Sequence, residues 1–199
     1  VLQALDHIRQ RTESTYLRLT TKRIDQQLLT LPTEEGQLEQ LREKVIQGAY
    51  RIVDRSTEPE YLPGENVVNI FATGAMIPEA INSSISLLSE GIYLNVINVT
   101  GPGKLYRSYQ EWSTSSIYAE QDQVFMPDLL TSSERKAPIV TVIDGHSHSL
   151  SWIGSAIGAQ CFPLVVNDFV QSGDTNDLYR EYGLDAGSIS AACYGALGL

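Results

Sequence analysis

Four short runs of apolar residues, rich in valine and isoleucine, recur through the chain. Nearly continuous apolar strands of this length are typical of a parallel sheet that helices cover on both faces. Apolar residues at helical spacing occupy most of the stretches between them, and strands that alternate with helices define a three-layer α/β domain. The predicted strands are 67–72, 93–99, 139–143 and 161–166.

Three apolar stripes predict helices that cover this sheet. Residues three, four and seven apart share one face of a helix, so each stripe marks the side that packs on the strands. We expect the middle stripe, with Trp152 beside it, to lie against Val140, Val142 and Val165. The stripes are Ile77, Ala80, Ile81, Ile85 and Leu88; Leu150, Ile153 and Ile157; and Ile189, Ala192, Cys193 and Leu197.

A further helix and an edge strand are predicted before residue 55. Thr33 as N-cap, followed by two glutamates, begins a helix that Gly48 ends. Residues 49–54 alternate in polarity and suit an edge strand, which would pair antiparallel with 67–72 across a short connection. The predicted fold is α/β, with three αβα layers around a mixed, mostly parallel five-stranded sheet that has one antiparallel edge strand. The apolar stripe of the first helix, expected to face a core, is Leu38, Leu41 and Val45.

The charge balance excludes two classes of partner. The 199 residues include 24 acidic and 14 basic side chains, a formal net charge of −10. Nucleic acids and anionic membrane surfaces both attract clustered Lys and Arg, so neither is expected to bind. No stretch approaches the roughly 18 apolar residues of a membrane helix. Cys161 and Cys193 stand in apolar surroundings typical of reduced core thiols, and we expect a cytoplasmic protein.

The sequence GHSHS over 145–149 follows a predicted strand and imitates the G-x-S-x-G nucleophile elbow of serine hydrolases. The last glycine of that motif is absent. That fold also needs a histidine after the serine in chain order, beyond this segment, and none follows. We therefore expect Ser147 to cap the helix that holds Trp152.

The same segment contains the best candidate for a contact site. Loops at the carboxyl ends of parallel strands are where ligands bind in α/β sheets. Histidine and carboxylate side chains also bind divalent metals, but two alternating histidines beside one aspartate are a weak ligand set. We predict no catalytic, cofactor-binding or metal-binding residue. The predicted interface or ligand loop residues are Asp144, His146, His148, Asp168 and Ser172.

A second segment, Gly101-Pro102-Gly103, resembles a dinucleotide-binding turn because it follows a predicted strand. The third glycine of that motif would fall at position 106, which is Tyr106. Pro102 also lacks the backbone N–H that a phosphate cradle would use. We therefore do not predict a dinucleotide site.

Larger motifs in the second half of the chain occur in a fixed order. N-V-T-x-P-G-x-L-Y-R begins at Asn98, and G-x-x-x-x-P-L begins at Gly158. D-F-x-x-S-G then begins at Asp168, and L-Y-R-x-Y-G-L-D-x-x-S-I begins at Leu178. In this order the chain resembles the C-terminal domain of the transketolase family. Within that family it looks most like the homodimeric, thiamine-diphosphate-dependent pyruvate (2-oxo acid) dehydrogenase component.

The resemblance implies a division of the chain. Residues 1–32 would be the tail of the pyrimidine-binding domain, with a strand over 15–20, plus a linker; residues 33–199 would be the C-terminal domain. The sequence begins at Val1, not at a methionine, and we expect a fragment of a longer protein. The implied partners are the rest of the parent chain, a second subunit of a homodimer and the lipoyl acyltransferase component.

The resemblance also implies a parent reaction, decarboxylation of a 2-oxo acid, with pyruvate expected, and acyl transfer to a lipoyl group. Thiamine diphosphate and Mg²⁺ would be the parent's cofactors. The chain lacks the G-D-G and N-N pair that hold them, so we expect no cofactor bound by this fragment and no catalysis by it. Two alternatives stay open: a transketolase parent, or a stand-alone protein-binding or anion-binding module of the same fold.

Two positions bear on the transketolase alternative. Related sugar-phosphate transferases place an arginine for the substrate phosphate near Lys22 and Arg23, but the register puts Thr21 at that position. This argues against ketose-phosphate transfer. Some dehydrogenase relatives place a histidine a few residues later, where this chain has Gln27.

Overall fold

The structure, a computed structural model, describes the chain except for residues 1, 11–19, 21, 119–124, 127–128 and 170. The strand predicted over 15–20 therefore lies outside the described residues, apart from Thr20. The predicted α/β class is confirmed. Five strands form one sheet in the order β1-β3-β2-β4-β5. They are β1 (Ala49–Val53), β2 (Val67–Ala72), β3 (Tyr93–Val99), β4 (Ile139–Val142) and β5 (Cys161–Leu164).

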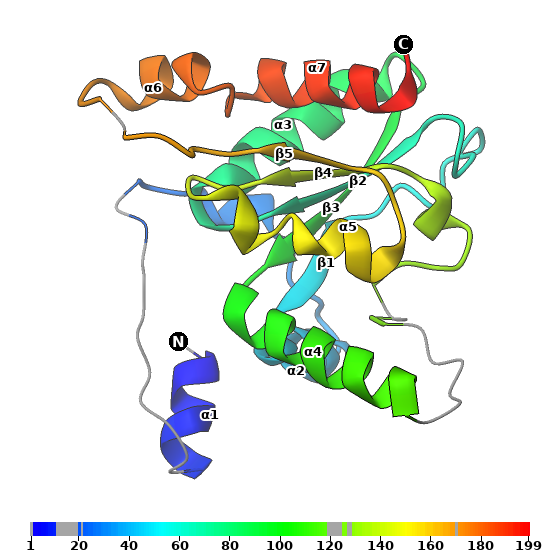
Figure 1. The fold of residues 1–199 in the computed structure, drawn as a ribbon, viewed down its shortest axis with the longest axis vertical. Coiled ribbons are helices and arrows are strands. Elements are labelled where there is room, and N and C mark those ends of the chain that lie inside the picture. Colours follow the sequence, from blue (N-terminus) through cyan, green and yellow to red (C-terminus); the bar gives the residue numbers. More distant parts are fainter. Residues whose placement is uncertain (1, 11–19, 21, 119–124, 127–128, 170) are drawn as a thin grey trace.

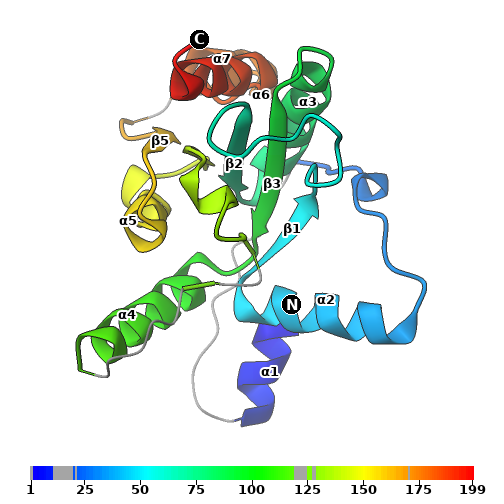
Figure 2. The ribbon, with the colours of Figure 1, turned by 90° about the vertical axis from the view of Figure 1, so that its right-hand side faces the viewer.

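Helices cover both faces of the sheet (Figure 1), and α3 and α7 lie together on one of them. On the other side lies α5, and α1, α2 and α4 extend beyond the sheet, as the turned view in Figure 2 shows. No helix among the described residues is long and apolar enough to cross a bilayer. The helices are α1 (Leu2–Gln10), α2 (Glu35–Gln47), α3 (Ile77–Leu88), α4 (Pro102–Tyr118), α5 (Trp152–Ile157), α6 (Thr175–Glu181) and α7 (Ala186–Leu197).

The edge strand β1 is antiparallel, as predicted, but its predicted partner is wrong. It pairs with β3, with Ala49 opposite Val99 and Tyr50 opposite Asn98. The strand β2 is central and has parallel neighbours on both sides, β3 and β4. Both sides of β2 are therefore occupied, and β1 pairs with the outer side of β3 instead.

The sheet separates two hydrophobic cores. Successive residues of β4 point to opposite faces of the sheet and therefore belong alternately to one core and to the other. Val140 and Val142 belong to the core under α3 and α7. Ile139 belongs to the opposite core, which includes Ile153 of α5. The expectation that α5 packs next to Val140 and Val142 is thus wrong, because successive side chains of a strand point to opposite faces. Its expected contact with Val165 is consistent with the structure, since Val165 packs against the same core as Ile153.

Two helix faces also differ from the prediction. In α3, Ile85 is 60% exposed, whereas Leu87 is buried, so the buried face is rotated from the predicted stripe. In α2, no residue is buried and Leu38 is exposed, because this helix lies beyond the sheet rather than on it. Its N-cap is Glu34, not Thr33, and it ends at Gly48 as predicted, with φ 117°.

The helix α5 approaches β5 closely, and Gly154 makes this possible. A Cβ atom added at Gly154 would lie 2.6 Å from the Cβ of Cys161, too close for any side chain. The predicted final helix is confirmed as α7, with Ile189 and Cys193 fully buried against the sheet. Burial raises the pKa of the Cys193 thiol to about 12, so this thiol stays protonated.

A buried carboxylate, Glu134, joins the edge strand to the segment before β4. Its two oxygens each lie 2.8 Å from the Arg51 guanidinium of β1. The Tyr61 hydroxyl donates to the same carboxylate at 2.7 Å. Asn69 of β2 donates to the Glu134 carbonyl at 2.8 Å and accepts from Asn95 of β3 at 3.0 Å. The network thus connects three strands through hydrogen-bonded side chains.

Replacing Glu134 should show how much the stability of the sheet depends on this network. We expect Glu134→Gln to lower the free energy of unfolding by about 3 kcal/mol at neutral pH, because the Arg51 charge loses its buried partner. As a control, Glu58→Gln should cost less than about 1 kcal/mol, since the partly exposed Arg55–Glu58 pair spans 3.6 Å. Urea titrations of the three proteins measure this, and equal losses in both variants would contradict it.

The loss of stability caused by Glu134→Gln should depend on pH. Burial alone would raise the pKa of Glu134, but hydrogen bonds from Arg51 and the Thr131 N–H outweigh it and lower the pKa from 4.5 to about 2. The folded-state pKa is below the unfolded one, so the stabilisation is complete above about pH 5 and is lost as the pH falls toward about 2. The stability difference between Glu134→Gln and the unsubstituted chain should shrink over that range.

The side of α5 that faces the sheet can be tested by two matched truncations. Ile153 is fully buried, whereas Ile157 is only partly buried against the same core. We expect Ile153→Ala to cost about 2–5 kcal/mol. Ile157→Ala should cost clearly less, because its side chain loses fewer packed neighbours. Denaturant titration distinguishes them, and a larger loss at Ile157 would mean that the helix is rotated.

Candidate functional site

The carboxyl ends of four parallel strands meet at one edge of the sheet, which we call the carboxyl edge. Ligands of α/β sheets bind at this edge, where loops rather than strands supply the side chains. Here the loops that follow β4 and β5 contain all five predicted site residues. The segments that follow β2 and β3 lead into α3 and α4.

The structure joins the loops after β4 and β5. The Ser147 N–H donates to the Asn167 side-chain oxygen at 3.1 Å, and the Val166 N–H donates to the Gly145 carbonyl at 3.0 Å. These contacts fix loop 144–149 relative to the first residues after β5. The prediction that Ser147 caps α5 is wrong, because the N-cap of α5 is Ser151.

The two histidines of this loop lie side by side. His146 precedes a short 3-10 turn over Ser147–Ser149, and its Nδ1 accepts the His148 N–H at 3.3 Å. The two rings meet edge to face, with centroids 4.8 Å apart. Asp144, His146 and His148 are all exposed, so the loop presents them outward rather than into the core.

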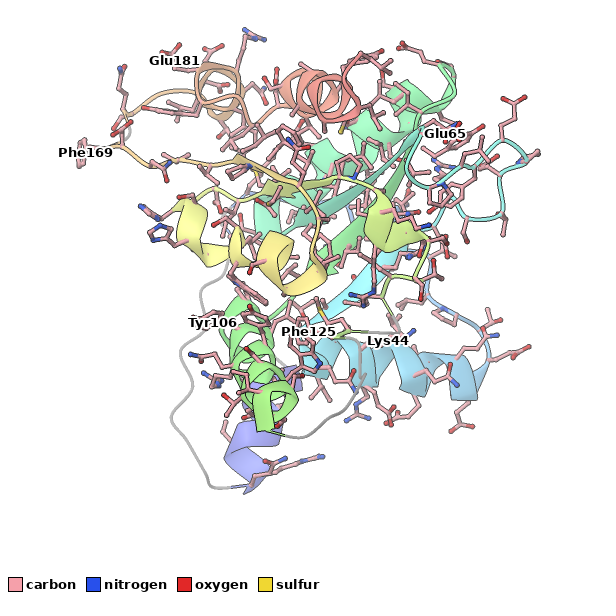
Figure 3. The ribbon with its side chains drawn as sticks, turned by 45° about the vertical axis from the view of Figure 1, so that its right-hand side comes forward. Lys44, Glu65, Tyr106, Phe125, Phe169 and Glu181 are labelled. Carbon is pink, nitrogen blue, oxygen red and sulfur yellow. The ribbon has the colours of Figure 1, made fainter. Side chains whose placement is uncertain are left out.

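The other two predicted residues, Asp168 and Ser172, lie in the exposed loop between β5 and α6. In the contacts described, Asn167 reaches loop 144–149, and neither Asp168 nor Ser172 does. Between them Phe169 is 99% exposed, and Figure 3 shows its ring at the outer end of the loop. An aromatic side chain that is wholly in water is typical of a contact residue.

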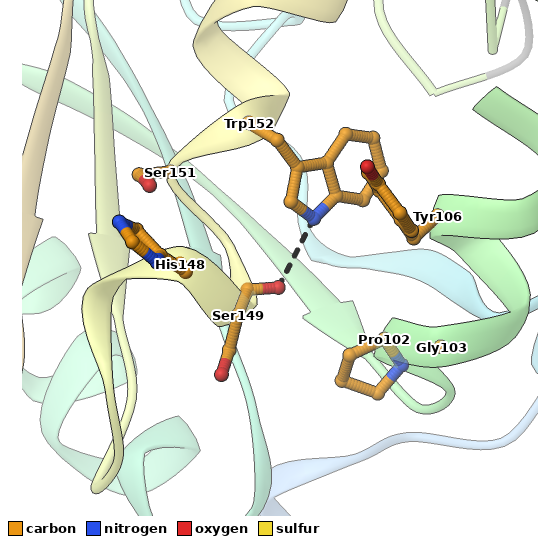
Figure 4. Close-up of a pocket in the computed structure, with 7 residues that line it drawn as sticks. All are labelled: Pro102, Gly103, Tyr106, His148, Ser149, Ser151 and Trp152. Carbon is orange, nitrogen blue, oxygen red and sulfur yellow. Dashed lines mark hydrogen bonds between the residues drawn. The ribbon is translucent and has the colours of Figure 1, made fainter. Parts of the chain in front are cut away.

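A groove of about 630 Å³ opens between α4 and the loop after β4 (Figure 4). Trp152 forms one wall, and its indole N–H donates to the Ser149 carbonyl at 3.1 Å, which fixes the ring. Tyr106 of α4 meets this ring edge to face at 5.3 Å between centroids. The lining residues are Pro102, Gly103, Tyr106, His148, Ser149, Ser151 and Trp152.

The sequence analysis missed this groove, although it singled out several of its residues. Pro102 and Gly103 were considered as a dinucleotide turn and as part of the first motif, but α4 itself was not predicted. The missed residue is Tyr106, which lies in the L-Y-R segment of the first motif. An apolar groove with an aromatic wall, two serines and an exposed histidine can accept an apolar or aromatic group that carries a polar end.

The sequence lacks the G-D-G and N-N pair that the resemblance assigns to the Mg²⁺ of a thiamine diphosphate site. Over the part of the chain that the structure describes, no three His, Cys, Asp or Glu side chains come together to hold a metal ion. His146 and His148, with Asp144 beyond them, do not form such a group. We therefore derive no catalytic step through this cofactor.

No protein-family model matches the sequence, and no curated protein matches it in a sequence search. Among solved structures, transketolase from Pichia stipitis, in complex with sedoheptulose 7-phosphate, has a TM-score of 0.54 at 15% identity over 79% of this chain and 19% of that chain. Transketolase from Leishmania mexicana has a TM-score of 0.53 at 17% identity, with the same coverage of each chain.

A third transketolase, from Campylobacter jejuni, has a TM-score of 0.50 at 16% identity over 75% of this chain and 18% of that chain. This chain therefore spans about a fifth of the length of the transketolases it matches. At these identities the likeness shows the fold, which is that of a transketolase C-terminal-like domain.

Substituting Phe169 tests whether its ring lies exposed in the loop or packs against the core of the domain. We expect Phe169→Ser to change the free energy of unfolding by less than about 0.5 kcal/mol. Phe162→Ala, in the partly buried wall of the α3–α7 core, should cost about 2 kcal/mol or more. Urea titration compares them, and a large loss at Phe169 would show that its ring packs on the domain.

Proposed function

We propose that this chain is the C-terminal domain of a thiamine-diphosphate-dependent 2-oxo acid dehydrogenase and that it does not itself carry the chemistry. The observation that carries the proposal is its fold, which matches transketolases over 79% of this chain and only 19% of theirs. The ordered motifs from Asn98 to Ile189 favour the pyruvate dehydrogenase component within that fold. Pyruvate is accordingly the proposed substrate of the parent.

The proposed role of the domain is to frame the parent's assembly. Phe169, the exposed histidines and the Tyr106–Trp152 groove all lie at or beside the carboxyl edge, where a neighbouring domain or subunit would find aromatic and polar contacts. Exposed apolar side chains on the helices beyond the sheet offer further contact positions. They are Leu5 and Ile8 of α1, Leu38 of α2 and Ile117 of α4.

Such surfaces are consistent with the proposed homodimer, since closed two-fold assemblies are the commonest oligomers. The lipoyl acyltransferase component is a further proposed partner of the parent. The fold likeness to transketolases makes a transketolase parent the main alternative. Against it stands Thr21, in the place where the sugar-phosphate transferases have an arginine.

The non-catalytic role predicts the response of this chain to the cofactor. Adding thiamine diphosphate with Mg²⁺ should leave the melting temperature unchanged, because the described residues form no metal-binding group. A ligand at about 100 times its dissociation constant would stabilise the chain by about 2.7 kcal/mol, a rise that differential scanning fluorimetry detects easily. A clear rise would contradict the proposal.

The parent activity is tested separately, in the complete protein to which the proposal assigns this domain. With cofactor and Mg²⁺, that protein should oxidise pyruvate with an artificial electron acceptor and should not transfer a ketol group from xylulose 5-phosphate to an aldose phosphate. Ketol transfer without pyruvate oxidation would establish the transketolase alternative. Neither activity, together with retained folding, would favour a binding module.

A further inference from the structure

Lys22, in the segment that precedes α2, reaches back to the carboxyl edge of the sheet. Its ammonium nitrogen lies 3.2 Å from a carboxylate oxygen of Glu79. It also lies 4.4 Å from the centre of the Tyr179 ring, over the face of that ring. The Lys22 and Glu79 side chains are only 27% and 18% exposed, so the contact is partly withdrawn from water.

The groups around this ammonium come from two separate helices. Glu79 lies in the first turn of α3, and Tyr179 lies in α6. Burial raises the pKa of the Tyr179 phenol, and the negative charges of Asp144 and Glu79 raise it further. A carboxylate together with an aromatic face is an arrangement that binds an ammonium ion.

The segment that carries Lys22 has a second attachment. Asp25 caps a short 3-10 turn, accepting the Gln27 N–H at 2.9 Å, and Leu28 at the end of that turn packs against the α3–α7 core. Arg23, the next basic residue, is exposed. Two anchors six residues apart therefore hold the stretch 22–28 against the domain, one of them ionic and one apolar.

We propose that Glu79 and Tyr179 form an ammonium-binding site whose ligand is the Lys22 side chain of the same chain. The site holds the segment 22–28 beside the carboxyl edge and so fixes where the chain enters the domain. The inference rests on contacts within this chain and does not depend on the parent reaction.

Native-state proteolysis with thermolysin tests the attachment, because this protease cleaves before large apolar residues such as Leu28, whose side chain packs against the core. Cleavage at this bond is identified by mass spectrometry of the fragments. Cleavage needs the segment to be released, so its rate reports the population of the released state. Lys22→Gln and Glu79→Gln should each raise the cleavage rate roughly 3- to 10-fold, as expected for losing a partly exposed ion pair and a cation–π contact.

Matched variants make the outcome specific. Arg23→Gln removes the neighbouring charge and should leave the rate unchanged, and Lys22→Arg keeps a cation at the site and should also leave it nearly unchanged. The double variant Lys22→Gln with Glu79→Gln should cleave no faster than Lys22→Gln alone, because Lys22→Gln already removes the ion pair with Glu79. Equal effects of Lys22→Gln and Arg23→Gln, or additive effects in the double variant, would overturn the proposal.

A second measurement does not depend on cleavage or on Glu79. Aromatic rings shift the NMR signals of protons above their face, so the ε-methylene of Lys22 should be displaced upfield from the other lysines. Its signal is identified by its loss in Lys22→Gln, and it should return to the ordinary position in Tyr179→Leu. An ordinary chemical shift in the unsubstituted chain would show that Lys22 does not occupy the site.

Discussion

The buried carboxylate of Glu134 is the constraint on which the rest of the sheet depends. It neutralises Arg51 of the edge strand, and its own carbonyl accepts from Asn69 of the central strand. A charge that is 1% exposed is tolerated only when every hydrogen bond around it is satisfied. Because Asn69 and Asn95 lie in the first halves of β2 and β3, this network stabilises the end of the sheet opposite the loops. The carboxyl edge therefore remains the end of the sheet that can bind a ligand or a partner.

Much of the fold could be predicted from the sequence, because the spacing of apolar residues indicates which of them are buried. All four parallel strands and the final helix were predicted, and the apolar runs of β2, β3 and β4 are buried almost throughout, whereas β5 at the edge is only partly buried. Periodicity shows which residues share a face but not what that face contacts. Val140 was therefore assigned to α5 although it faces α7, and Leu38 was expected in a core although α2 lies beyond the sheet. The pairing of Arg51 with Glu134 spans 83 residues, and no local pattern reveals it.

The candidate site was predicted in part for the same reason. The loop after β4 could be located because the end of a parallel strand is visible in the sequence, and the structure joins that loop to the residues after β5. The groove beside that loop could not be predicted. It forms where Tyr106 of α4 meets Trp152 of α5, and no pattern in the sequence indicates that these two helices are neighbours. Asp168 and Ser172 lie in the loop after β5, and the contact of that region with loop 144–149 is made by the neighbouring Asn167.

The two ends of the sheet thus differ in the kind of interaction that they use. At the Glu134 end the charged groups are buried and hydrogen-bonded to one another. Removing one partner leaves the other charge buried without a partner or water, and this destabilises the whole sheet. At the carboxyl edge Lys22, Glu79 and Tyr179 are partly hydrated, so their contact is weak enough to open and close without unfolding the domain. The ammonium contact that holds the preceding segment accordingly lies among loops and helix ends rather than within the strands, where its loss leaves the sheet itself bonded.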